Sequence, residues 1–193
     1  ATHNITNIRN KLSIDLFTYV VDNEEIDDIY RSFFKSDVSE IDASTDLALA
    51  EVMYRVASKY GVKYVLEGHS FIEEGVSPLG KSYFDGKYIY SIHKKFGTRK
   101  MKTYPLMTFT AFLKWTILKR IKKIRPFWYM NYSKEDAKTL LKTQFGWKDY
   151  GGHHLENRLT AFGHSVYFPQ KFHIDYRNNT LSAKVRNGNM DRD

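Results

Sequence analysis

The chain has 193 residues, which suits one domain or one domain with an appendage. Apolar residues make up 42% of it and aromatic residues 16%, enough for a packed core. It contains no cysteine, which excludes disulfides and cysteine-ligated zinc or iron–sulfur sites, and no apolar run reaches the ~18 residues that span a bilayer. These absences favour a cytoplasmic location.

The net charge of +8 is unevenly distributed. Residues 15–51 are rich in acids, whereas residues 94–125 are strongly basic. A basic block attracts phosphate, nucleic acid or an anionic membrane surface, although a solvated helix face is the more common explanation of such a run.

The first part of the chain alternates between helical and strand-like patterns. Ile5, Ile8 and Leu12 have helical spacing, and residues 14–21 form a β-branched and aromatic run typical of a strand. Residues 24–35 are predicted to form a second helix, with acids in its first turn where the helix dipole favours them.

A third helix is expected to begin at one of the N-cap candidates Ser44, Thr45 and Asp46 and to end before Gly61, which suits the C′ position. Its apolar positions are Leu49, Val52, Met53, Val56, Ala57 and Tyr60. A strand at 62–67 follows directly. The order strand, helix, helix, strand indicates a parallel sheet with helices as crossovers.

The second half is predicted to be largely helical after a long functional loop at 75–107, which contains a short helix near 86–95. An amphipathic helix is expected to begin at Thr108 and to be stopped by Pro126. Further helices are expected from Ser133 to Gly146 and near 153–166 and 179–187. The helix after Thr108 carries six cations: Lys114, Lys119, Arg120, Lys122, Lys123 and Arg125. With its aromatic residues, it fits membrane-surface docking, RNA binding or a solvated face.

The most informative stretch is the turn after the strand at 62–67, where Gly68, His69 and Ser70 are followed by Glu73 and Glu74. In an open α/β sheet, ligands bind outside the carboxyl ends of the strands. Glycine lets the backbone approach a ligand closely, and His69 with Glu73 is an i, i+4 pair on any helix that starts here. An ordinary strand-to-helix turn with exposed acids explains the pattern equally well.

A histidine-rich stretch near the C-terminal end invites a metal hypothesis, since His153, His154, His164 and His173 accompany Glu156. Adjacent histidines cannot share a helix face, and no His-x-x-x-His pair occurs, so metal binding is disfavoured against structural or substrate-contacting roles. The sequence contains no phosphate-loop, dinucleotide-binding or nucleophile-elbow motif, which disfavours nucleophilic hydrolysis.

Eight stretches are jointly more specific than any one alone: residues 14–22, 44–46, 64–75, 92–97, 102–105, 124–127, 151–158 and 169–172. Together they resemble the N-acetyl sugar amidotransferases of the ATP-pyrophosphatase (PP-loop) superfamily, which act in bacterial surface-polysaccharide biosynthesis. The resemblance runs over essentially all 193 residues.

The resemblance implies an α/β fold with a Rossmann-like (adenine nucleotide alpha hydrolase-like) parallel sheet and helices on both faces, incomplete at the N-terminus. A mostly α-helical C-terminal region would follow. We therefore expect a partial nucleotide-binding α/β domain at residues 1–107 and a helical region at residues 108–193.

The resemblance also implies a chemistry that uses ATP and Mg²⁺. ATP would activate the oxygen of a sugar's acetamido group as an adenylate, and ammonia from a partner glutaminase subunit would displace AMP to leave an acetamidino group. The expected setting is lipopolysaccharide or O-antigen biosynthesis, with an N-acetyl sugar as substrate. Nucleic acid is disfavoured as a partner, and peripheral membrane contact is compatible with this function. The alternative is an RNA-binding or tRNA-modifying relative in the same superfamily.

Residue roles follow from the same resemblance. Glu67, Gly68, His69 and Ser70 would lie at the superfamily's second nucleotide motif, and Arg125 in its later arginine–proline element, as ATP-binding residues. Glu73, with Glu74 beside it, would hold Mg²⁺ or orient the pyrophosphate. The first choices for the sugar pocket are His153, His154, Glu156 and Arg158.

The Ser-Gly-Gly-x-Asp-Ser loop of the superfamily is absent, as are the N-terminal cysteines that family members often use for a metal. Together with a chain that opens inside a helix, this indicates that an N-terminal portion is missing and that only part of an ATP site is present.

We therefore expect no ATP–pyrophosphate exchange by this chain alone. Incorporation of labelled pyrophosphate into ATP measures the exchange, and a detectable rate would contradict the prediction.

Overall fold

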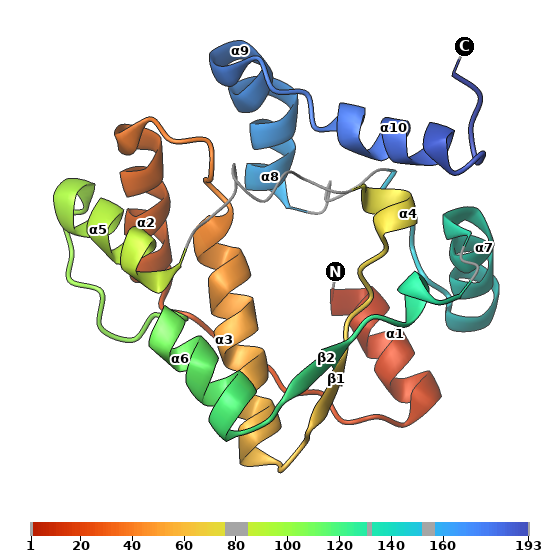
Figure 1. Ribbon diagram of the computed structural model, residues 1–193, viewed down its shortest axis with the longest axis horizontal. Helices are drawn as coiled ribbons and strands as arrows, with labels where there is room; N and C mark the ends of the chain where they lie inside the picture. Colours follow the sequence, from red (N-terminus) through yellow and green to blue (C-terminus); the bar gives the residue numbers. More distant parts are fainter. Residues whose placement is uncertain (1, 76–84, 131–132, 152–156, 193) are drawn as a thin grey trace. The chain divides into compact units, whose positions relative to one another are not determined.

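The computed structural model describes residues 2–75, 85–130, 133–151 and 157–192 (Figure 1). Its elements in chain order are α1 (Thr2–Leu12), α2 (Asn23–Ser36), α3 (Ala43–Lys59), β1 (Tyr64–Leu66), α4 (Phe71–Glu74), α5 (Gly86–Phe96), α6 (Phe109–Leu113) with a π-helical turn (Lys114–Leu118), β2 (Lys122–Ile124), a 3₁₀ turn (Pro126–Trp128), α7 (Lys134–Phe145), α8 (Arg158–Phe162) with a π-helical turn (Gly163–Tyr167), α9 (Phe168–Phe172) and α10 (Arg177–Arg186). In the described part of the chain, no helix is both long and apolar enough to cross a membrane.

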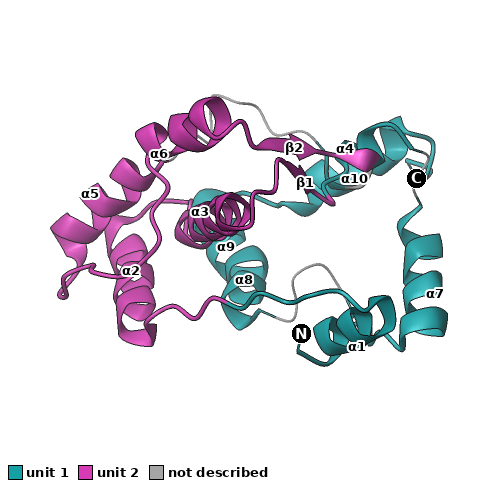
Figure 2. Cartoon of the chain, turned by 90° about the horizontal axis from the view of Figure 1, so that it is seen from below, with its two compact units in different colours: residues 1–18, 69–76, 127–193 teal, residues 19–68, 77–126 magenta. Residues whose placement is uncertain are grey.

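The chain divides into two compact units (Figure 2). Unit 1 comprises residues 1–18, 69–76 and 127–193, and unit 2 comprises residues 19–68 and 77–126. Unit 2 contains the two strands with α2, α3, α5 and α6. The predicted domain boundary between residues 107 and 108 falls inside unit 2. The division into a nucleotide-binding domain and a helical region stays a prediction.

Several elements are fixed at their ends by local contacts. Asp22 caps α2 by accepting hydrogen bonds from the backbone N–H groups of Glu24 and Glu25, at 2.9 and 3.0 Å. Ser133 caps α7, whose C-terminus is followed by Gly146 in the left-handed conformation. Gly61 follows α3 with a φ of 69°. The helices predicted at α1, α2, α5, α7 and α10 are confirmed.

The strand predicted at residues 14–21 is wrong, because this segment is irregular. Its apolar side chains Ile14, Leu16, Phe17, Tyr19 and Val20 are exposed. β-Branched and aromatic residues favour a strand through packing on neighbouring strands. Within the described residues, the segment at 14–21 pairs with no strand.

Helix α3 begins earlier than predicted, with Asp42 as its N-cap residue. The predicted caps therefore lie inside the first turn, where the N–H groups of Thr45 and Asp46 donate to the carbonyl of Asp42. The buried stripe is also rotated away from Leu49 and Tyr60, which are exposed, and contains Ala43, Ser44, Leu47, Ala48, Glu51, Tyr54 and Ala57. Because some residues of this stripe are polar, the spacing of apolar residues alone does not reveal it.

Buried Glu51 is compensated by two donors. Its carboxylate accepts hydrogen bonds from Trp115 Nε1 at 3.0 Å and from Arg55 Nε at 2.8 Å. Trp115 packs with Tyr54, Ala57 and Ile121 in the core cluster between α3 and the segment before β2. The carboxylate thus fixes the register of the π-helical turn against α3.

The basic amphipathic helix predicted from Thr108 to Pro126 is wrong beyond Leu118. Arg120 has a φ of 55°, and residues 122–124 form β2 in parallel with β1, with Tyr64 opposite Lys122 and Leu66 opposite Ile124. Pro126 begins a 3₁₀ turn. The residue before a proline is biased toward extended backbone, and β-branched residues suit a strand, so this local chemistry favours β2.

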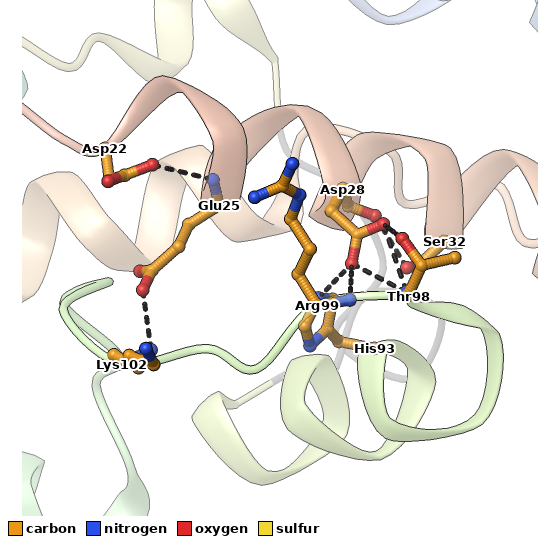
Figure 3. Close-up of polar contacts among 8 residues, drawn as sticks. All are labelled: Asp22, Glu25, Asp28, Ser32, His93, Thr98, Arg99 and Lys102. Atoms are coloured by element: carbon orange, nitrogen blue, oxygen red, sulfur yellow. Dashed lines mark hydrogen bonds and ion pairs between the residues drawn. The ribbon is translucent and has the colours of Figure 1, made fainter.

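Two buried carboxylates on α2 hold the segment at residues 98–104 (Figure 3). Asp28 accepts hydrogen bonds from the backbone N–H of Thr98 at 2.9 Å and of Arg99 at 2.9 Å, and lies 2.8 Å from Nε2 of His93. Glu25 accepts the N–H groups of Lys102, at 2.7 Å, and of the next two residues. Burial raises the pKa of both carboxyls, but the hydrogen bonds outweigh it, so the pKa of each lies below its ordinary value.

Replacing Asp28 by asparagine should lower the free energy of unfolding by about 2–4 kcal/mol, because an amide cannot accept all of these hydrogen bonds. Urea denaturation of the 193-residue chain measures the loss. The control is Asp27→Asn on the same helix, which removes an exposed carboxylate and should cost little. Equal losses in the two variants would contradict a special role for Asp28.

The lowered pKa of Asp28 makes the free energy of unfolding depend on pH. Because its folded-state pKa lies below the unfolded-state value of about 4, its contribution is complete well above pH ~4 and is lost as the pH falls toward the folded-state pKa. The stability difference between the wild type and Asp28→Asn should therefore shrink as the pH is lowered from about 6 to about 3. A constant difference over this range would argue against the lowered pKa.

Candidate functional site

The carboxyl ends of the two parallel strands lie side by side in unit 2. Glu67 follows β1 directly and Arg125 follows β2, and the backbone N–H of Glu67 donates to the carbonyl of Ile124 at 2.8 Å. The carboxylate of Glu67 accepts hydrogen bonds from Arg125 Nε and Lys123 Nζ, both at 2.7 Å. The structure therefore brings together Glu67 and Arg125, two predicted nucleotide-binding residues far apart in the sequence.

The electrostatics of this strand-end cluster (Glu67, Lys123 and Arg125) are positive, since two cations share one carboxylate. Burial raises the pKa of Glu67, but the hydrogen bonds and charges of both cations outweigh it, so this pKa is lowered. Burial, with the nearby carboxylate, raises the pKa of Tyr54, over whose ring the Lys123 ammonium lies at 5.7 Å. An ionised Glu67 fixes both cations at the strand ends, where anions bind in parallel sheets.

The next part of the predicted nucleotide turn belongs to unit 1, because the division between the units passes between Gly68 and His69. The Nδ1 atom of His69 contacts the carboxylate of Glu74. Glu74 is the neighbour of Glu73, the predicted partner of His69, whose side chain lies outside the described residues. Trp128 lies against this turn, with its ring centroid 6.5 Å from that of His69 and 5.7 Å from that of Phe71. The turn is thus packed on one side rather than surrounded by water.

Ser70 is buried, with 1% of its surface exposed, and its hydroxyl has no hydrogen-bond partner among the described groups. A buried hydroxyl without a partner costs free energy and is uncommon in native proteins. It marks this turn as locally unsatisfied, at a residue that the sequence predicts to bind ATP.

Most residues predicted to shape the sugar pocket lie outside the described residues, namely His153, His154 and Glu156. Arg158 is the first residue of α8, which Asn157 caps, and its side chain is exposed.

A magnesium ion needs several oxygen ligands around one point. Among the described residues, no group of three histidine or acidic side chains could hold a metal ion. Glu73, the predicted ligand, falls outside that set.

Lys123 belongs to the strand-end cluster and lies over the ring of Tyr54, and neither residue was predicted at this site. Lys123 was assigned to a helix face, and only the recognition of a strand before Arg125 would have placed it beside Glu67. The π-helical turn and the parallel pairing that align these side chains depend on tertiary contacts.

Residues 156–193 match a protein-family model described as LPS biosynthesis protein WbpG-like, C-terminal domain. In the described part of the chain, this match covers α8 to α10 in unit 1. The match supports a relationship to the WbpG-like family and a role in lipopolysaccharide biosynthesis. Neither the curated proteins nor the solved structures gave a match.

Gly75 connects the turn to the matched segment within unit 1. It has a φ of 77°, and a Cβ atom here would lie 2.8 Å from the backbone oxygen of Asn179 in α10. Because both backbones are held in helices or their ends, the contact cannot open without moving α4 from α10.

Gly75→Ala should therefore lower the free energy of unfolding by about 2–4 kcal/mol, from backbone strain and the clash with α10 together. Gly151→Ala is the matched control, because Gly151 has a φ of 83° and nothing within 4 Å of its Cβ position. The control should cost about 1 kcal/mol from strain alone. Urea denaturation compares the two, and equal losses would contradict close packing at Gly75.

Proposed function

We propose that the chain is part of an ATP-dependent amidotransferase that converts the acetamido group of an N-acetyl sugar to an acetamidino group in lipopolysaccharide biosynthesis. The match of residues 156–193 supports the biosynthetic setting. The sequence resemblance supports the reaction, and the strand-end cluster supports a phosphate-bearing substrate.

The strand-end cluster carries the proposal. Two cations fixed by one carboxylate at the carboxyl ends of parallel strands fit the anionic groups of a nucleotide. Glu67 holds Arg125 and Lys123 in place before a ligand arrives, so less side-chain entropy is lost on binding. A planar guanidinium suits phosphate oxygens better than an ammonium does, which gives Arg125 the leading role.

The chemistry has two steps. The acetamido oxygen attacks the α-phosphorus of ATP, and pyrophosphate leaves with the broken P–O bond. Ammonia then adds to the activated carbon, and AMP departs with the former amide oxygen, which leaves the C=N bond of the acetamidino group. The cations of this chain would bind phosphate oxygens and stabilise the charge that develops on the leaving pyrophosphate.

Arg125→Gln should weaken pyrophosphate binding about tenfold or more, because it removes a charge-assisted contact of ~1.5–3 kcal/mol. Isothermal titration calorimetry with inorganic pyrophosphate measures the affinity. The matched control is Arg120→Gln, since Arg120 is an exposed arginine in the turn before β2 and its loss should change the affinity little. Equal weakening in both variants would indicate a diffuse charge effect and contradict the proposed site.

The RNA-binding alternative rests on the same basic segment. The salt dependence of binding distinguishes it from the proposed function. RNA binding by several phosphate contacts should fall steeply as salt is raised, whereas binding of one pyrophosphate at a fixed cluster should fall mildly.

Transfer of labelled ammonia to an N-acetyl sugar, with the glutaminase partner and the PP-loop portion supplied, tests the full reaction. No transfer under those conditions would reject it.

A further inference from the structure

A basic and apolar surface lies at the end of the sheet where both strands begin. It is formed by two turns of unit 2, residues 59–63 and residues 117–122, which we call the strand-start tip. Lys63 Nζ donates to the carbonyl of Lys119 at 2.9 Å, and the N–H of Lys122 donates to the carbonyl of Lys63 at 2.8 Å. Both turns can be followed in Figure 1, at the ends of α3 and of the α6 segment.

The apolar side chains of the tip are directed to solvent rather than into the core. Leu118 is 77% exposed and Ile117 is 62% exposed, with exposed Tyr60 and Val62 on the other turn. The next residue inward, Ile121, is buried in the core cluster. The chain therefore anchors the tip from beneath while leaving aliphatic groups outside, an arrangement that burial within this unit does not explain.

The two turns and their neighbouring residues are rich in cations and contain no acid. The tip contains or adjoins six basic residues: Lys59, Lys63, Lys114, Lys119, Arg120 and Lys122. Residues 52–66 and 97–125 contain no aspartate or glutamate. Exposed aliphatic side chains on segments rich in lysine and arginine match the boundary between lipid tails and anionic headgroups, where the tails accept the aliphatic groups and the phosphates attract the cations.

We propose that the strand-start tip docks on an anionic lipid bilayer. The surface differs from the amphipathic helix expected from the sequence, because the structure ends that helix at Leu118 and presents the cations on two adjoining turns. RNA is a poorer fit, since exposed aliphatic groups replace most of the aromatic and arginine platforms on which bases stack. Glu67 and Arg125 of the strand-end cluster lie at the other end of the same strands. The inference does not depend on the proposed reaction.

Flotation of the 193-residue chain with vesicles tests the proposal. Vesicles of phosphatidylcholine with phosphatidylglycerol should retain the wild type, whereas vesicles of phosphatidylcholine alone should not. Ile117→Asn with Leu118→Asn should reduce retention several-fold, and Lys119→Gln with Arg120→Gln should reduce it roughly fivefold for each cation removed. All four side chains are exposed, and circular dichroism checks that each variant is folded.

Matched controls come from the same unit. Leu49→Asn removes an exposed leucine of α3, and Lys94→Gln with Lys95→Gln removes two exposed cations of α5. Both controls should retain the binding of the wild type. The proposal is overturned if the wild type ignores anionic vesicles, if the controls lose as much as the tip variants, or if only the charge variant loses binding. It is also overturned if the charge variant loses binding to single-stranded RNA while the wild type fails to float.

Discussion

The fold of unit 2 depends on the capture of residues 98–104 by two buried carboxylates of α2. Asp28 and Glu25 accept consecutive backbone N–H groups that would otherwise be buried without partners or exposed to water. Tyr104, at the end of the segment, donates its hydroxyl to the carbonyl of Ser44 in α3 at 3.0 Å. One irregular segment is thereby tied to two helices, and the chain that leaves it is directed toward α6.

That constraint is passed on to the strand ends. After α6, Trp115 hydrogen-bonds to Glu51 and fixes the π-helical turn on α3, so β2 begins in register with β1. The register places Arg125 and Lys123 beside Glu67. The arrangement that we propose to bind phosphate therefore results from contacts made well away from it, in the core between α3 and the segment before β2. The same register leaves the two basic turns adjoining at the opposite end.

The chain uses buried charge in two different ways. In the interior, Asp28, Glu25 and Glu51 are held by donors on several elements, and such groups are retained only when fully hydrogen-bonded. At the strand ends, Glu67 is partly exposed and shares its carboxylate between two cations, which leaves net positive charge for a ligand. The first arrangement stabilises the fold, and the second is suited to binding.

The sequence by itself determined the elements whose signals are local: the capped helices at α2 and α7, the glycine ends of α3 and α7, and the strand before Gly68. It also singled out Glu67 and Arg125, through a resemblance rather than through geometry. Only the tertiary structure decided that residues 14–21 form no strand, that the basic segment turns into β2, and that Lys123 joins the cluster. Strand pairing and buried hydrogen bonds join residues far apart in the chain, and no local pattern records which partner each residue will meet.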